Sequence, residues 1–281
     1  MPGAPLTVGV TAASWRQTLP AEARLFWRSS FGSLLSRESL TVLMPLLILW
    51  ELLPRLALVP ASLVPPPSTL FSSFSLMLQK HHLLAHLGAS ALRFFLGFTL
   101  AVATAFPLGV LIGWNRFIRK HCLPLFQILA PIPPPAWVPV TMVVLGIGLP
   151  MQVFLIFLGV FYPVLFSTYQ GISETNPRYI ASARVFGASE FTIIIHVHIW
   201  HALGSVIMGI RIGIALGLVM LVVAEMQSGG SGVGYLLLRG KEYFQIDHMV
   251  VCMLILGAAG WLMTEIMKYA ELKLAVWRME R

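Results

Sequence analysis

Six long apolar runs divide this sequence, and they constrain its fold more than any other feature. A helix needs about 20 residues to cross a bilayer. The runs cover residues 40–59, 87–114, 123–145, 151–168, 204–224 and 249–269. Of the 281 residues, 57% are hydrophobic and 11% are charged, compared with about 25% charged residues in soluble domains. Because a soluble core of this length could not bury so much apolar surface, we predict an all-α integral membrane protein with about six transmembrane helices.

Lysine and arginine residues are distributed unequally between the two sides of these runs. Thirteen of the 19 lie on one side, with four in each terminal tail, three in the second loop and two in the fourth. The other side holds four, namely Arg55, Lys80, Arg239 and Lys241. Because cytoplasmic loops carry the excess of positive charge, we expect both termini to be cytoplasmic. The net charge of +8 therefore reflects membrane orientation and does not indicate nucleic-acid binding.

We expect no cleavable signal before the first run, since no compact apolar segment precedes a small-residue cleavage site. Instead, the stretch Ala21–Ser39 mixes leucine and aromatic residues with three arginines. This composition favours a helix lying in the membrane surface, and a tail without fixed structure is the alternative. The predicted domains are an N-terminal tail with this interfacial helix (residues 1–39), a transmembrane domain (residues 40–275) and a C-terminal tail (residues 276–281).

Prolines interrupt the third apolar run within the stretch "LAPIPPPAWVP". An interior proline costs a helix about 3 kcal/mol and removes a hydrogen bond, so three consecutive prolines cannot continue a regular helix. Irregular backbone inside a bilayer is tolerated only where protein or water surrounds it. The stretch is therefore either an element that lines or gates a pathway, or a sharp turn before a shorter span over residues 138–149. The candidate pathway residues here are Pro133, Pro134, Pro135 and Trp137.

Two charged residues of the fifth run, Arg211 and Glu225, are further pathway candidates, because charges inside a membrane are commonly functional. They are 14 residues apart, or about 21 Å along a helix, so they cannot pair with each other within it. Structural roles are the alternative for both. Near the end of the sixth run, Glu265 is expected to pair with Lys268 or Lys273.

Glycines recur at every fourth position in two of the runs. Gly109 and Gly113 do so in the second run, and Gly209, Gly213 and Gly217 in the fifth. Such spacing lets helix backbones approach one another closely in a membrane. We expect this packing within the chain, and an interface between subunits is the alternative.

Motifs for nucleotide binding and catalysis are absent from the sequence. No Gly-Lys-Ser/Thr tripeptide occurs, and the glycines of "GGSGVGYLL" (residues 229–237) have the wrong spacing for a dinucleotide loop. We interpret this stretch as an external loop or a re-entrant turn. His196, His198 and His201 do not share one helix face, which disfavours a metal site. We therefore expect no catalytic residue, no metal and no cofactor on this chain.

The polar segment "ISETNPRYIASARVFGASEF" lies between the fourth and fifth runs. Asn176 and Pro177 can start a helix, because proline fits the first helical turn. Gly187 should end that helix, and a second short helix should begin near Ala188 or Ser189. A short helix with a small and apolar face can bind in the groove of a partner protein, and an ordinary loop is the alternative.

Part of this segment, "ASARVFGAS", resembles the EAA loop of bacterial ABC-importer permeases, whose core is Glu-Ala-Ala, three residues and then glycine. Gly187 stands at the glycine position and Ala183 at the second alanine, whereas Ala181 replaces the glutamate and Ser182 the first alanine. The stretches "PIPPPAWVPVTMVVLGIG", "FLGVFYPVLFSTYQGI", "RIGIALGLVMLVVAEM" and "YFQIDHMVVCMLILGAAG" resemble the nitrate/sulfonate/taurine/bicarbonate branch of these permeases. The resemblance covers about residues 64–275.

The resemblance implies a type I importer fold in the bacterial inner membrane, surrounded by lipid. This chain would be the permease subunit that forms the pathway for a small anion or organosulfur solute. Two copies, most simply a homodimer, would associate with two P-loop ATPase subunits, which bind ATP and Mg, and with a periplasmic or lipoprotein solute-binding protein. The ATPase would dock on the cytoplasmic 173–191 segment. The implied coupling residues are Arg178, Tyr179, Ala181, Ser182, Ala183, Arg184, Phe186, Gly187, Ala188 and Ser189.

Two other classes of membrane protein remain open from the residues alone. A secondary transporter driven by an ion gradient would need membrane-buried carboxylates for ion coupling, and Glu225 is the obvious candidate. A membrane enzyme is disfavoured by the lack of paired acidic residues and of a metal site.

Overall fold

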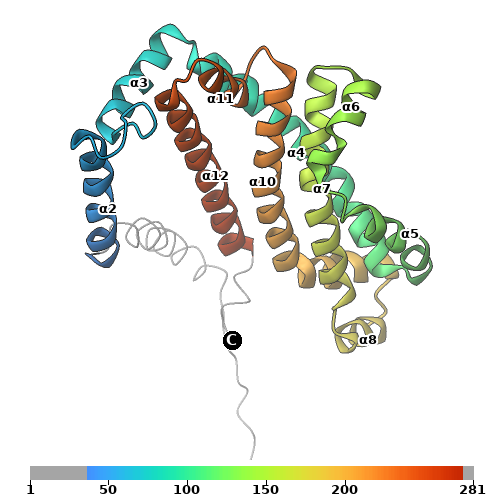
Figure 1. Cartoon of the computed structure of the whole chain (residues 1–281). Coiled ribbons are helices and arrows are strands. Elements are labelled where there is room, and N and C mark those ends of the chain that lie inside the picture. The colour runs from blue at the N-terminus through green and yellow to red at the C-terminus, as the bar shows by residue number, and fades with distance from the viewer. Residues whose placement is uncertain (1–36, 275–281) are drawn as a thin grey trace, which may run out of the picture. The chain divides into compact units, whose positions relative to one another are not determined.

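The computed structural model describes residues 37–274 of the chain (Figure 1). Most of the predicted interfacial helix and the whole C-terminal tail lie outside these residues. The described residues form helices joined by short loops, and no strand occurs between residues 37 and 274. The all-α fold class is confirmed. The chain divides into two units, Met1–Ala61 and Ser62–Arg281, each of which is described by itself.

Helix α2 (Arg37–Arg55) makes up most of the described part of the first unit. An ion pair between Glu51 and Arg55 forms within it, with 2.5 Å between the charged atoms. The helix corresponds to the first apolar run, but charged residues lie near both of its ends. For this reason it is not among the segments that are both long and apolar enough to cross a membrane.

The second unit contains all the longer apolar helices. Its elements are α3 (Pro67–Lys80), α4 (Leu83–Trp114), α5 (Arg116–Leu129), a 3-10 turn (Pro134–Trp137), α6 (Val138–Leu145), α7 (Leu149–Ser173), α8 (Pro177–Val185), α9 (Glu190–Ile193), a π-helical turn (Ile194–Ile199), α10 (Trp200–Ser228), α11 (Val233–Glu242) and α12 (Ile246–Leu274). Figure 1 shows α8 beyond one end of α10 and α11 beside the other end.

Four segments are long and apolar enough to span a membrane, namely α4, α7, Glu190–Ser228 and Ile246–Glu271. A fifth span results if α5 and α6, which meet at 84°, are counted together. These five correspond to the second to sixth apolar runs. Between residues 37 and 274, four or five segments are long and apolar enough to span a membrane, whereas the sequence predicted about six. The difference is α2, whose charged residues keep it below this criterion.

Helix α7 packs against both α4 and α10 and forms the centre of the second unit. Its side chains Ile156, Val160 and Leu165 are buried in one cluster with Phe94 of α4 and Leu221 of α10. Large apolar side chains on the outer faces of other helices stay exposed, as expected for surfaces that meet lipid or another subunit rather than water.

The glycines that recur at every fourth position in α4 and α10 permit the close packing of these helices on α7. A β-carbon at Gly113 would lie 2.5 Å from the β-carbon of Ile172, and one at Gly209 would lie 2.6 Å from that of Ser167. These distances are too short for non-bonded carbon atoms, so larger residues would push α7 away from its neighbours. The predicted close packing within the chain is confirmed.

The third apolar run is broken where its prolines predict. The four residues of the 3-10 turn separate α5 from α6, and α6 has only eight residues. A helix of that length rises about 12 Å, which is too short to cross a bilayer. Pro133 and Pro135 are exposed and Pro134 is half-buried, whereas Trp137 packs on a buried cluster that includes Met220 of α10.

The helices α3 and α11 were not predicted from the sequence. The stretch "GGSGVGYLL" was interpreted as a loop or re-entrant turn, but only its first four residues form a loop, and α11 starts at Val233. Gly229, Gly230 and Gly232 adopt positive φ angles in that loop, which glycine does without steric cost. Leu236, Leu237 and Arg239 favour a helix further along, whereas Val233 and Gly234 at its start do not.

Candidate functional site

The 173–191 segment forms two short helices at the end of α7. Asn176 Oδ1 accepts a hydrogen bond from the backbone N–H of Arg178 at 2.9 Å, and Pro177 occupies the first position of α8. The asparagine satisfies a backbone donor that the helix leaves unpaired, and proline has no donor to satisfy. The predicted start of this helix is confirmed.

A glycine turn ends α8. Gly187 has a φ angle of +78°, and the N–H groups of Gly187 and Ala188 donate to carbonyls one turn earlier, at 2.9 and 3.0 Å. This pair of bonds is a Schellman motif, which favours glycine because it requires the left-handed conformation. Ser189 then caps α9, since its Oγ accepts the N–H of Thr192 at 3.2 Å. The predicted break and second helix are confirmed.

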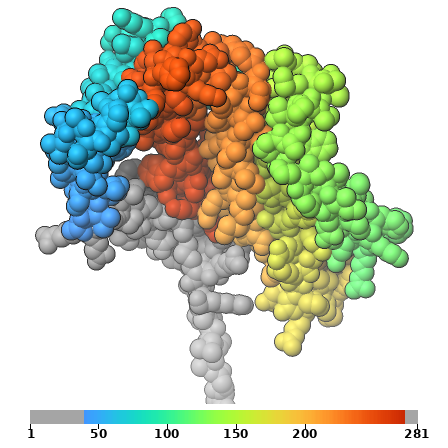
Figure 2. Space-filling model, in the orientation of Figure 1, coloured from blue at the N-terminus to red at the C-terminus, as the bar shows by residue number. Residues whose placement is uncertain are grey.

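Large apolar side chains of this segment point into solvent. Val185 is 85% exposed, Phe186 89% and Phe191 71%. An ion pair of 2.8 Å between Arg184 and Glu190 joins α8 to α9 across the turn. In Figure 2 the segment (yellow) protrudes beyond the spans that it joins. Apolar groups held in place on a protruding polar segment are typical of a contact with another protein.

The ten residues implied for coupling lie together on α8, the glycine turn and the cap of α9. Ala183 and Ala188 are half-buried. The exposed ones are Arg178, Tyr179, Ala181, Ser182, Arg184, Phe186, Gly187 and Ser189. The structure therefore places all ten on one continuous surface segment.

A cavity of about 410 Å³ lies behind this segment. Arg116 and Arg119 of α5 and Arg184 of α8 contribute to its lining. Ala181, which stands where the resembling permeases have a glutamate, also lines the cavity. A carboxylate at this position would therefore face an arginine-rich surface.

Among the candidate pathway residues, Glu225 is fully buried and is held by three donors. Its carboxylate accepts hydrogen bonds from Ser90 Oγ at 2.7 Å, Arg93 Nη1 at 2.8 Å and the N–H of Gly234 at 2.9 Å. Arg93 donates in turn to the carbonyl oxygen and to Oγ of Ser231, at 2.9 and 2.6 Å. This network fastens the loop between α10 and α11 to α4.

Arg211, the other charged candidate, belongs to a different ion pair. Its Nη2 lies 2.7 Å from Glu271 Oε2 on α12. The predicted pair of Glu265 with Lys268 also forms, at 2.6 Å. Sequence reasoning did not find the partners of Arg211 and Glu225, which lie 60 and 132 residues away along the chain.

The histidines at the start of the fifth run make local contacts. His198 is buried, and its Nδ1 lies 3.0 Å from Thr175 Oγ1. His196 Nδ1 lies 3.2 Å from the carbonyl oxygen of Thr192. Within residues 37–274, no group of three side chains is placed to bind a metal ion.

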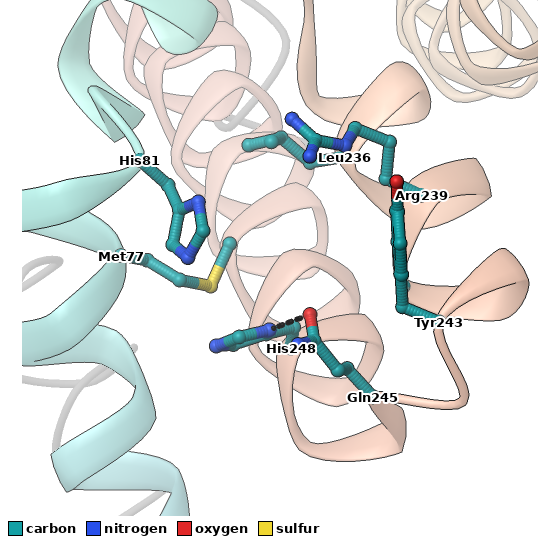
Figure 3. Close-up of a pocket in the computed structure, with 8 residues that line it drawn as sticks. Met77, His81, Leu236, Arg239, Tyr243, Gln245 and His248 are labelled. Atoms are coloured by element: carbon teal, nitrogen blue, oxygen red, sulfur yellow. Dashed lines mark hydrogen bonds between the residues drawn. The ribbon is translucent and has the colours of Figure 1, made fainter.

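A second cavity, of about 230 Å³, lies between α3, α11 and α12 (Figure 3). Met77 and Arg239 line it, together with the rings of His81 and His248, whose centroids are 5.4 Å apart. His248 Nδ1 lies 2.7 Å from Gln245 Oε1. Burial of His81 and, to a smaller extent, the neighbouring His248 and Arg239 lower the pKa of the His81 imidazole.

Comparison with known proteins identifies the family of this chain. Residues 105–270 match the family described as binding-protein-dependent transport system inner membrane component. The chain belongs to this family of importer permeases. It is therefore a multi-pass protein of the inner membrane. The match begins within α4 and ends within α12, so it includes the 173–191 segment and the broken α5–α6 pair.

Relatives of this permease occur in several organisms. It is 37% identical over 183 residues to a putative ABC transporter permease of Methanocaldococcus jannaschii, covering 65% of this chain and 68% of the relative. It is 29% identical over 239 residues to a putative aliphatic sulfonates transport permease of Bacillus subtilis, covering 84% and 87%. A nitrate import permease of Synechocystis is 30% identical over 183 residues, covering 65% and 66%. The predicted branch of the family is confirmed.

Proposed function

We propose that this chain is the permease subunit of an ATP-driven importer for a small oxyanion, such as nitrate or an organic sulfonate. The names of the Bacillus and Synechocystis relatives support this solute class, which includes taurine and bicarbonate as related candidates. A second copy of the chain, P-loop ATPase subunits and a solute-binding protein complete the transporter. ATP and Mg bind to the ATPase, and the permease carries no catalytic residue.

The exposed apolar turn of the 173–191 segment is the observation that supports the proposed coupling to an ATPase. Val185, Phe186 and Phe191 are more than two-thirds exposed, although the surrounding segment is capped and held by an ion pair. A short helix of fixed geometry with an apolar end fits a groove of a partner protein. Closure of the ATPase subunits would move this segment and the spans α7 and α10 attached to it.

The orientation proposed from the charges agrees with this assignment. With α5 and α6 counted as one span, the segment's side carries nine lysine and arginine residues after α4, three before α6, two in the segment and four from Lys268 onward, whereas the other side carries two, Arg239 and Lys241. The segment's side is therefore the cytoplasmic side by the positive-inside rule. The cytoplasm is also where ATP is available. The α11 end then faces outward, toward the solute-binding protein.

The buried carboxylate Glu225 does not favour a transporter driven by an ion gradient. A coupling carboxylate has to release its ion to each side of the membrane in turn. Glu225 is 0% exposed and accepts hydrogen bonds from Ser90, Arg93 and Gly234. These contacts support a structural role in holding the α10–α11 loop.

Purification from the native cells tests the coupling. The tagged chain is extracted in mild detergent, and the proteins retained with it are identified by mass spectrometry. We expect a P-loop ATPase with the wild-type chain and its loss from Phe186→Asp. Phe244→Asp is the matched control, because Phe244 is 86% exposed but follows α11 at the other end of α10. Equal retention by both variants would contradict the docking assignment.

A further inference from the structure

We infer that a cavity at the α11 end of the second unit is an oxyanion-binding site of the permease, and that it suits a short aliphatic sulfonate. The inference rests on the proposed function for the solute class and adds the place and chemistry of binding. The cavity has a volume of about 370 Å³. It is lined by α4, the turn between α6 and α7, the start of α7 and the loop between α10 and α11. It lies at the end of the spans opposite the 173–191 segment.

One side of this cavity carries hydrogen-bond donors. Arg93, Gln152, Ser228 and Ser231 all line it. Gln152 is 3% exposed, and its amide donates to the hydroxyl of Ser228. An amide, two hydroxyls and a guanidinium are groups that bind the oxygen atoms of a sulfonate or nitrate.

The guanidinium of Arg93 retains donors for a ligand. A guanidinium has five N–H groups. Three are used, one for Glu225 Oε1 and two for the carbonyl and hydroxyl oxygens of Ser231. The Nε–H and one Nη2–H have no hydrogen-bond partner among residues 37–274. Two donors on one planar group match two oxygen atoms of an oxyanion.

The ion pair of Arg93 with Glu225 is oriented so that its positive end meets the cavity. Arg93 is 14% exposed and lines the cavity, whereas Glu225 is 0% exposed and does not. No acidic side chain is among the lining residues. The start of α7 at Leu149 adds the partial positive charge of a helix N-terminus. A site with this field attracts an anion but binds it weakly, since Glu225 offsets the arginine charge, and weak binding lets a transported solute leave.

The other side of the cavity is apolar. Leu92, Ile147 and Leu149 line it and are 58%, 64% and 46% exposed. These side chains can cover a short alkyl chain whose anionic head lies at Arg93. No lining carboxylate is present to pair with an ammonium group. We therefore expect butanesulfonate to bind more tightly than nitrate, which lacks an alkyl chain, or taurine, which carries an ammonium.

A pair of charge variants at one position tests the site. Leu92→Glu and Leu92→Lys place opposite charges at the rim of the cavity, where Leu92 lines it beside the polar groups of Arg93 and Ser231. Sodium butanesulfonate is titrated against the full-length chain in a non-ionic detergent, and binding is followed by saturation-transfer NMR of its alkyl protons. We expect Leu92→Glu to weaken binding about fivefold and Leu92→Lys to strengthen it by a similar factor, the effect of one partly solvated charge.

A control variant and a competitor separate the alternatives. Leu84→Glu lies about two turns nearer the start of α4, is 71% exposed and does not line the cavity, so it should leave binding unchanged. Absence of butanesulfonate binding, or equal affinities for both Leu92 variants, would overturn the inference. Displacement of butanesulfonate by phosphatidylglycerol at equimolar concentration would assign the cavity to a lipid headgroup and would also overturn it.

Uptake by cells distinguishes failure of this inference from failure of the proposed function. Deletion of the gene for this chain should abolish uptake of sulfonate or nitrate if the proposed function is correct. If deletion abolishes uptake and the Leu92 variants bind alike, only the cavity assignment is wrong. If deletion leaves the uptake of every oxyanion unchanged, the proposed function itself is wrong.

Discussion

Gly187 shows how one residue fixes the shape of the 173–191 segment. Its φ angle is +78°, and nothing lies within 4 Å of where a β-carbon would be. A substitution therefore acts through the backbone alone. We expect Gly187→Leu to insert into the membrane normally but to lose the ATPase in co-purification, since a left-handed leucine costs about 1–2 kcal/mol. Gly187→Asn is the matched control, because asparagine tolerates this conformation. If Gly187→Leu retains the ATPase like the wild type, the turn has no part in docking.

Ala181 offers the opposite experiment, a gain of interaction. It stands at the glutamate position of the EAA loop and lines a cavity to which Arg116, Arg119 and Arg184 contribute. We expect Ala181→Glu to increase the amount of ATPase retained during a wash at low salt, because position 181 is exposed and its new carboxylate can pair with a basic group of the ATPase. Ala181→Gln has a similar size and no charge, so it should behave as the wild type. An equal increase with both variants would indicate that side-chain size, not charge, is responsible.

The sequence predicts ion pairs between neighbours on one helix, but not ion pairs between residues that are far apart along the chain. Glu51 with Arg55 and Glu265 with Lys268 were predictable, because helix geometry brings such neighbours together. The bond of Arg93 to Glu225 was not, since it joins residues 132 positions apart. Both residues could be recognised as charges inside apolar runs, but only the packing of α4 beside α10 shows that they neutralise each other.

At the scale of elements, the packing of α4 on α7 depends on space at single glycines. A β-carbon at Gly113 would lie 2.5 Å from that of Ile172, whereas one at Gly257 in α12 would meet nothing within 4 Å. We expect Gly113→Ala to lower stability by about 1–3 kcal/mol through overpacking. Gly257→Ala should raise it by up to about 1 kcal/mol through helix propensity. Thermal unfolding of the detergent-purified variants measures both. Equal shifts would show that α4 and α7 can separate without cost.

The contact of α3 with α11 and α12 should depend on pH. Burial and, to a smaller extent, His248 and Arg239 lower the pKa of His81 from its usual value of 6.5. The unfolded chain therefore binds the proton more readily than the folded chain, so stability is full above pH 6.5 and falls as pH decreases through 6.5 toward the folded pKa. We expect faster hydrogen exchange at the end of α3 at pH 5.5 than at pH 7.5, after correction for the intrinsic rate. His81→Gln should lose most of this difference, and an unchanged difference would exclude His81 as its cause.

The elements differ in how far local signals specify them. The two short helices of the 173–191 segment follow from an Asn-Pro start and a glycine stop, which act within a few residues. The break before α6 follows from consecutive prolines. Helices α3 and α11 carry no such clear signals, and they are less apolar than the spans. They form because tertiary packing provides a partner for their apolar faces. The cavities between elements depend on that packing as well, and no sequence pattern predicted them.

At the scale of the whole second unit, one continuous helical segment connects the two proposed sites. Glu190–Ser228 has 39 residues, which corresponds to about 58 Å at 1.5 Å per residue. It begins beside the Ser189 cap of the 173–191 segment, and its last residue, Ser228, lines the proposed oxyanion cavity. A movement imposed on α9 by an ATPase would therefore reach the solute site through a single element. For the movement to reach the solute site, this segment has to shift as one unit between two packed states.

The orientation of the chain decides whether both proposals can hold together. Phe186 and Phe244 are 89% and 86% exposed at opposite ends of α10, so each can be replaced by cysteine in a chain whose native Cys122 and Cys252 are changed to alanine. We expect a membrane-impermeant maleimide to label Phe244→Cys in intact cells and Phe186→Cys only after permeabilisation, because the side with nine of the eleven lysine and arginine residues that lie outside the spans after α4 should be cytoplasmic. The reverse pattern would place the 173–191 segment outside, where no ATPase could meet it, and would turn the oxyanion cavity toward the cytoplasm.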